Sequence, residues 1–187
     1  MESRTVYFEK PGEDNTDAVF EIARKRAQEL GIKTVIIAST RGNTAVKAVD
    51  AFKGFKVVIV SHVYGSREPN VNPMSDENRK AVTDKGGIIV TSAHAFGSID
   101  RAMRKSFNMM NLGETIASVL RTFGQGMKVV CEIPLMAADA GVVRTDEEVI
   151  SIGGTGRGAD TAVVLNPVNT TDYFNLKVKE ILCKPRF

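Results

Sequence analysis

The segment Ser39-Thr40-Arg41-Gly42-Asn43-Thr44-Ala45 combines hydroxyl groups, a guanidinium and a glycine at one probable turn. The apolar run before it, Thr34–Ser39, predicts a strand, and the residues after it follow a helical period. A helix that begins beside a strand end presents free backbone N–H groups and the positive end of its dipole. Such a turn binds phosphate, and Gly42 would let the backbone approach the ligand closely. The alternative is that Asn43 or Thr44 only caps the helix.

A second cluster, Gly153-Gly154-Thr155-Gly156-Arg157-Gly158-Ala159-Asp160-Thr161, lies between two probable strands and therefore predicts a hairpin loop. A dinucleotide fingerprint must open a helix after a strand, so this loop is not one. Its backbone amides can wrap a charged or planar ligand, with Thr155, Gly156, Arg157, Gly158 and Thr161 as candidate contacts. The alternative is a flexible hairpin that uses glycine only for turn geometry.

Residues that follow the ends of expected strands form a third set of candidates: His62, Tyr64, His94, Phe96 and Glu132. In an open α/β sheet, ligands bind outside the carboxyl ends of the strands. We expect Glu132 to close a strand over Met127–Ile133. Each histidine has a structural hydrogen-bonding role or a catalytic role as its two interpretations. The chain lacks a nucleophile elbow, and no spacing supports a metal site.

The remaining elements follow from hydrophobic periodicity and from turn residues. We expect helices over 16–30, after the Ser39–Thr44 turn, over 75–86, in one or two pieces over 95–126, and from Pro134 to Gly141. Further strands are expected over 57–61, 88–91, 149–152, 161–165 and 176–182. Strands alternating with helices, followed by a strand-rich tail, indicate a three-layer α/β/α domain over 1–187. Its sheet is expected to be mixed, mostly parallel and of about five strands.

The composition is that of an ordinary globular protein, with 43% hydrophobic and 25% charged residues and a net charge of +3 among 187 residues. No basic patch interleaved with aromatics indicates nucleic-acid binding, and no apolar run is long enough to span a bilayer. Two widely separated cysteines and a charged N-terminus without a signal-peptide core predict a cytoplasmic protein with reduced thiols. Met103, Met109 and Met110 with Phe107 and Leu112 predict core packing, or else contact with a planar ligand or a second copy, which leaves homo-oligomerisation open.

At the two loops the sequence resembles the C-terminal α/β domain of pyruvate kinase. In that domain a Thr/Ser-rich turn binds a phosphate of an allosteric sugar bisphosphate, and a glycine-rich loop closes over the ligand. The segments Glu132–Gly141 and Gly153–Ala162 are similar to a group of stand-alone archaeal and bacterial proteins of this domain type, and the likeness covers most of residues 10–183.

This resemblance implies that the protein binds flavin mononucleotide (FMN), with the phosphate at the Ser39–Thr44 turn. The parent domain often has a tryptophan at its sugar-binding loop, and this chain contains none. Pyruvate kinase catalysis belongs to a barrel of about 250 residues, for which this chain has no room, so we expect no pyruvate kinase activity. A flavin-dependent oxidoreductase and a regulatory sensor of a phosphorylated metabolite are the alternatives.

Overall fold

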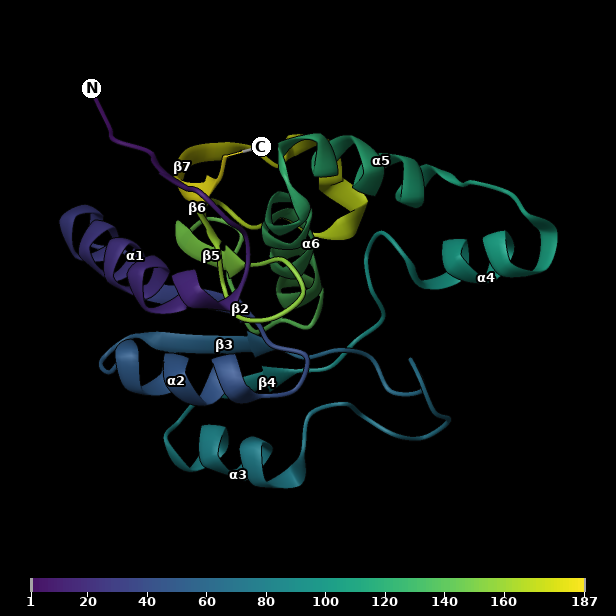
Figure 1. Cartoon of the computed structure of the whole chain (residues 1–187), viewed down its shortest axis with the longest axis horizontal. Coiled ribbons are helices and arrows are strands. Elements are labelled where there is room, and N and C mark those ends of the chain that lie inside the picture. The colour runs from purple at the N-terminus through teal and green to yellow at the C-terminus, as the bar shows by residue number, and fades with distance from the viewer. Residues whose placement is uncertain (1, 187) are drawn as a thin grey trace.

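A seven-stranded mixed sheet forms the centre of the structure, a computed structural model that describes residues 2–186 (Figure 1). Its order is β1-β7-β6-β5-β2-β3-β4. The strands are β1 (Val6–Phe8), β2 (Thr34–Ala38), β3 (Lys56–Val60), β4 (Ile88–Val90), β5 (Val149–Gly153), β6 (Thr161–Leu165) and β7 (Val178–Pro185). The α/β class and the mixed sheet are therefore confirmed, with seven strands in the described chain where about five were expected.

Strands β5, β2, β3 and β4 run parallel to one another, in the register Thr34–Val149 and Thr34–Lys56. Strand β6 runs antiparallel between β5 and β7. The short strand β1 pairs parallel with β7, with Val6 opposite Cys183. This last pairing joins the two ends of the chain, which is a contact that local sequence patterns do not reveal.

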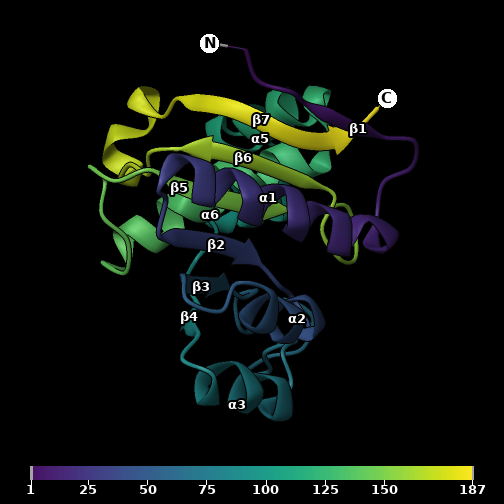
Figure 2. The ribbon, with the colours of Figure 1, turned by 90° about the vertical axis from the view of Figure 1, so that its left-hand side faces the viewer.

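Helices cover both faces of the sheet because its central strands bury side chains on both sides (Figure 2). On β2, Val35 and Ile37 pack with α1 (Thr16–Leu30), α2 (Asn43–Ala51) and α3 (Asp76–Asp84). Ile36, which points to the opposite face, packs with α5 (Leu112–Leu120) and α6 (Gln125–Asp139). The alternation along each strand thus divides the core into two layers.

Two helix ends agree with their sequence signals. Helix α1 ends at Gly31, which has the left-handed conformation with φ 71°. Helix α3 begins after Ser75, whose hydroxyl accepts a hydrogen bond from the Asn78 backbone N–H at 3.2 Å. These signals involve only neighbouring residues, so their effect does not depend on tertiary contacts.

The expectation of a strand over Met127–Ile133 is wrong, because these residues belong to helix α6. Pro134 lies inside this helix and does not begin one, and Glu132 therefore does not close a strand. Residues 130–138 are all buried, so the helix shows no polar face and its sequence is as apolar as a central strand.

Helix α4 (Ser98–Phe107) extends from the body as an arm that leads into α5 (Figure 1). None of its residues is buried. Phe107, Met109, Met110 and Leu112 are exposed, which corrects the expectation that this methionine-rich segment packs in the core.

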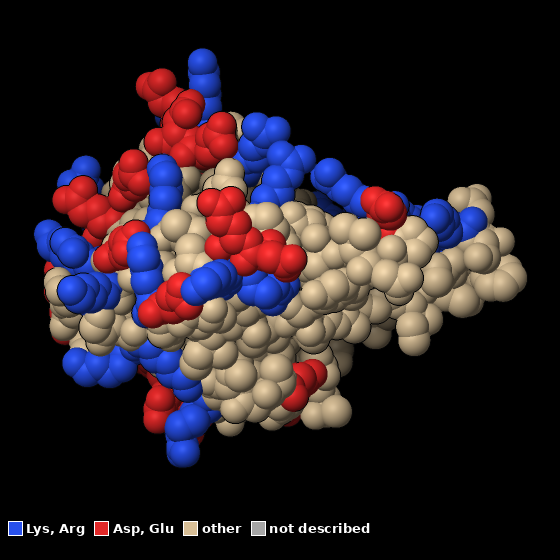
Figure 3. All heavy atoms as spheres, turned by 90° about the horizontal axis from the view of Figure 1, so that it is seen from below, with Lys and Arg blue, Asp and Glu red and all other residues tan. Residues whose placement is uncertain are grey.

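No helix within the described residues has the length and apolarity required to cross a membrane. On the face drawn in Figure 3, basic and acidic side chains are intermixed.

Candidate functional site

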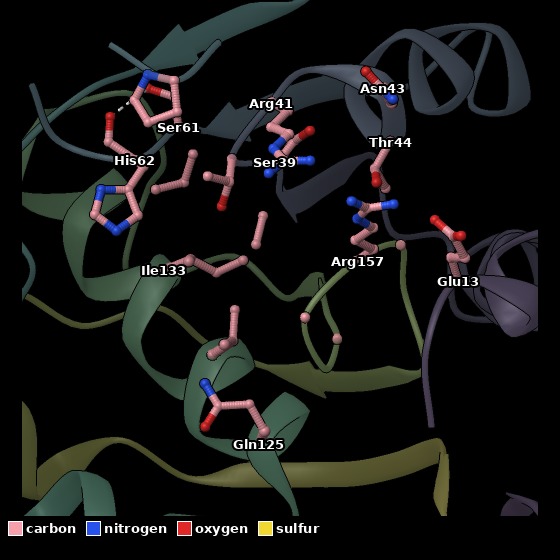
Figure 4. Close-up of a pocket in the computed structure, with 18 of the residues that line it drawn as sticks. Glu13, Ser39, Arg41, Asn43, Thr44, Ser61, His62, Gln125, Ile133 and Arg157 are labelled. Atoms are coloured by element: carbon pink, nitrogen blue, oxygen red, sulfur yellow. Dashed lines mark hydrogen bonds between the residues drawn. The ribbon is translucent and has the colours of Figure 1, made fainter. Parts of the chain in front are cut away.

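A cavity of about 1110 Å³ lies beyond the carboxyl ends of β2 and β3, between the start of α2, the β5–β6 loop and α6 (Figure 4). The candidate residues that line it are Ser39, Thr40, Arg41, Asn43, Thr44, His62, His94, Glu132, Gly156, Arg157 and Gly158. These residues come from five separate segments of the chain, which meet at one cavity beyond the strand ends, as the strand-end rule for α/β sheets predicts.

The turn from β2 into α2 presents unused donors to the cavity. Helix α2 begins after Gly42 without a side-chain cap, so neither Asn43 nor Thr44 acts as the capping residue. The Ala45 N–H donates to Ser39 Oγ at 3.2 Å. In the described chain the N–H groups of Asn43 and Thr44 have no acceptor, as expected for the first turn of a helix. The Arg41 guanidinium lines the cavity with them, and residues 39–44 are here called the anion cradle, because free N–H groups at a helix start have the donor chemistry that anions require.

Gly42 shapes the anion cradle from behind. Its φ of 98° is in the left-handed region, and a Cβ at this position would lie 2.5 Å from Cβ of Asn78. The Asn78 side chain donates to the Arg41 carbonyl at 2.9 Å and to Asn43 Oδ1 at 3.2 Å. Gly42 is thus required for the backbone conformation and for contact with α3, whereas the sequence suggested contact with the ligand.

The β5–β6 hairpin loop (residues 154–160, the glycine loop) forms the opposite wall. The buried carboxylate of Asp160 accepts hydrogen bonds from the N–H groups of Thr155 at 3.0 Å and Gly12 at 3.1 Å, and from the Thr161 hydroxyl at 2.7 Å. The bond from Gly12, together with the Ala159 N–H donating to Thr16 Oγ1 at 3.0 Å, fixes the loop against residues 12–16. Figure 4 shows Arg157 reaching from this loop toward Thr44 at the start of α2. The two predicted basic residues, Arg41 and Arg157, therefore line one cavity.

His62 and His94 come together at one end of the cavity, here called the inner end. They follow β3 and β4, and their ring centroids lie 4.6 Å apart with an edge-to-face arrangement. Burial and the neighbouring His94 lower the pKa of His62. Nδ1 of His94 lies 3.5 Å from Oε2 of Glu132, and its buried Nε2 has no hydrogen-bond partner among the described residues.

Glu132 connects the histidine pair to a buried lysine on the same helix. Its carboxylate forms an ion pair with Lys128, one helical turn earlier, and accepts the Phe96 N–H at 3.0 Å. Burial acts to raise the pKa of Glu132, but the donors His94 and Lys128 outweigh burial and lower it to about 2. Burial lowers the pKa of Lys128. Glu132 is 2% exposed and Lys128 9%, so this charged pair is part of the cavity floor.

Several predicted site residues do not line the cavity. Ala45 is fully buried behind the anion cradle, and Thr161 is buried beside Asp160. Phe96 packs against Tyr173 with a centroid distance of 5.3 Å, and Tyr64 is 52% exposed beyond β3. Thr155 serves the glycine loop through its N–H group. These residues lie next to lining residues in the sequence, but their side chains do not line the cavity.

The sequence interpretation missed the residues that come from helices, from the N-terminal segment and from the loop between β3 and α3. They are Glu13, Asp14, Asp17, Lys47, Arg67, Arg101, Arg121, Gln125 and Lys128. The spacing of Lys128 and Glu132 by four residues was an available signal, because such pairs share a helix face. It was hidden by the expectation of a strand. Within the described chain, no group of three His, Cys, Asp or Glu side chains is placed to hold a metal ion.

The comparison with known protein families agrees with this architecture. A family model described as "Pyruvate kinase, alpha/beta domain" matches residues 17–165. The match includes the anion cradle, the histidine pair, α6 and the glycine loop, and it ends with the last residue of β6.

Proposed function

Since the chain belongs to the family of the pyruvate kinase alpha/beta domain, we propose that it binds a phosphorylated planar ligand in this cavity, and that the ligand is FMN. The observation that carries the proposal is the anion cradle facing the glycine loop across one cavity. A phosphate dianion is stabilised by free N–H groups at a helix start and by charge-assisted hydrogen bonds from arginine.

The donor chemistry of the cavity fits the parts of this ligand. Arg41, Asn43 and Thr44 would hold the phosphate at the start of α2. Gly156, Arg157 and Gly158 would border the polyol chain. The ring would extend toward His62 and His94, at the inner end. When bound, the flavin would supply hydride-transfer chemistry, and the residues of the chain would position it and control access of water.

Fluorescence titration of the purified protein with FMN and with riboflavin, which lacks the phosphate, tests the proposal. We expect FMN to bind more tightly, because only FMN uses the anion cradle. The Arg41→Ala variant should bind FMN more weakly by about 1.5–3 kcal/mol, which is roughly ten- to hundredfold in affinity. Thr44→Val removes one neutral donor and should cost less, about 0.5–1.5 kcal/mol.

Riboflavin binding provides the internal control, because Arg41→Ala should change it little. Arg24→Ala, an exposed change on α1, should leave both affinities unchanged. Equal loss of FMN and riboflavin affinity in Arg41→Ala would exclude the anion cradle as the phosphate site. If neither compound binds, FMN is not the ligand, and a sensor of another phosphorylated metabolite becomes the better proposal.

A flavin-dependent oxidoreductase is the second candidate, favoured by the cluster of His62, His94, Lys128 and Glu132 at the inner end of the cavity. A binding protein needs no titratable groups beside the ring, whereas proton transfer coupled to flavin chemistry does. Anaerobic bleaching of bound FMN by a reduced nicotinamide would favour this activity over binding alone.

A further inference from the structure

The inner end of the cavity has an excess of positive charge that the proposed FMN phosphate does not neutralise. Arg101 on α4, Arg121 in the short helix η2 (Arg121–Phe123) and Lys128 on α6 line it together. Within residues 2–186, neither arginine forms an ion pair: Arg121 donates to the neutral Gln125 side chain at 2.7 Å. The nearby Arg104, by contrast, pairs with Glu114 at 3.1 Å. Arg101 and Arg121 therefore keep their charge free for a ligand.

The Glu132 carboxylate, which lines the same cavity, is already used. Glu132 serves Lys128, His94 and the Phe96 N–H at the same time. Arg101 and Arg121 further lower the pKa of Lys128, and Arg101 lowers that of His62, so their positive charge reaches the buried cluster. An anion placed between these groups would convert mutual repulsion into attraction.

A second observation also indicates a missing partner at this place. Nε2 of His94 is buried without a hydrogen bond, which is costly unless a ligand or a water satisfies it. Arg101 and His94 are both neighbours of Gly97, because a Cβ built on Gly97 would be 3.6 Å from Nη2 of Arg101 and 3.9 Å from Cβ of His94. The unsatisfied Nε2 of His94 and the unpaired guanidinium of Arg101 thus belong to residues that line the same cavity.

We propose that Arg101, Arg121 and Lys128 form a second anion subsite, which holds a small carboxylate or phosphate compound against His62 and His94. The cavity, at about 1110 Å³, exceeds the usual 300–1,000 Å³ of a pocket for one small ligand. The inference rests on the proposed function only for the neighbour of this anion, namely the flavin ring. The ligand class is a small anion that binds beside the ring.

The two histidines of the chain make the test specific, because both belong to this cluster. Imidazole signals of the flavin-free protein are followed by NMR during titration with oxalate and, separately, with inorganic phosphate at constant ionic strength. We expect both histidine signals to shift in a saturable way with at least one probe. A response to oxalate alone identifies a carboxylate subsite, and a response to phosphate alone identifies a phosphate subsite.

Variants of the exposed arginines locate the bound anion. Arg101→Ala and Arg121→Ala should each weaken binding at least about tenfold, whereas the control Arg24→Ala should not. Arg41→Ala, which alters the anion cradle, should leave the oxalate or phosphate response of the histidines intact. Unmoved histidine signals, or a response lost in Arg41→Ala and kept in Arg101→Ala, would overturn the second subsite. Because no flavin is present, this outcome is independent of FMN binding.

Discussion

At the scale of single residues, we expect the buried ion pair of Lys128 and Glu132 to affect the stability of the fold. Both side chains belong to α6 and are buried, and the Glu132 carboxylate has three donors around it. Removing one partner of a buried pair leaves the other charge without compensation in a poorly solvated place. The stability of the protein therefore depends on two residues that also line the cavity.

Glu132→Gln should destabilise the protein by about 3–5 kcal/mol, because Lys128 and His94 lose their acceptor charge. Urea unfolding followed by circular dichroism measures this change. Glu21→Gln, an exposed change on α1, is the matched control and should have almost no effect. Adding Lys128→Met to Glu132→Gln should recover part of the loss. A single variant as stable as the wild type would contradict the importance of the pair.

The lowered pKa of Glu132 also predicts the acid response. With a folded pKa of about 2 against an ordinary value of 4.5, the contribution of this carboxylate is complete above pH 4.5. It is lost progressively as the pH falls from 4.5 toward 2. Urea midpoints should fall more steeply over this range in the wild type than in the Glu132→Gln, Lys128→Met double variant. Parallel pH profiles for the two proteins would refute this assignment.

At the scale of elements, helix α6 contains a proline that removes one of its own hydrogen bonds. Pro134 has no N–H, so the carbonyl of Val130, four residues earlier, loses its helical donor. The hydroxyl of Ser151 on β5 replaces it, donating to the Val130 carbonyl at 2.9 Å in a fully buried position. A strand thus completes the helix, which explains how the proline is accommodated in the core.

Ser151→Ala should cost about 1–3 kcal/mol, because the buried Val130 carbonyl would lose this donor. Pro134→Ala restores a backbone N–H at the required position, so it should reduce the cost of Ser151→Ala. A double-mutant cycle from urea unfolding measures this coupling. Strictly additive effects would show that Ser151 and Pro134 act independently.

At the scale of the whole molecule, acidic and basic side chains come to the cavity wall from different parts of the fold. The acidic side chains at its wall come from residues 13–17 beside the glycine loop, together with the buried Glu132. The unpaired Arg101 and Arg121 belong to the helical arm and its connection to α6. The two ends of the cavity therefore differ in the charge of the residues that line them.

We predict that the purified 187-residue chain does not transfer phosphate from phosphoenolpyruvate to ADP. The family match covers the alpha/beta domain, and a catalytic barrel of about 250 residues exceeds the whole length of this chain. A coupled assay of pyruvate formation, with intact pyruvate kinase as the positive control, measures this. Turnover that co-purifies with the protein through several columns would contradict the prediction.

Features that depend only on neighbouring residues could be predicted from the sequence. These include the β2–α2 junction with its anion cradle, the hairpin character of the glycine loop, the position of His62 and His94 after strands, and the limits of α1. An apolar run followed by turn residues indicates a strand end in any surroundings, and a left-handed glycine such as Gly31 ends a helix locally.

Which residues share the cavity, and which lie behind it, depends on contacts between distant parts of the chain. Helix α6 is buried over most of its length, so its pattern does not distinguish it from a central strand, and Pro134 appears as a break until Ser151 is seen beside Val130. Lys128, Arg101 and Arg121 reach the inner end through packing of separate helices. Such contacts join distant parts of the chain, and a local pattern of residues carries no information about them.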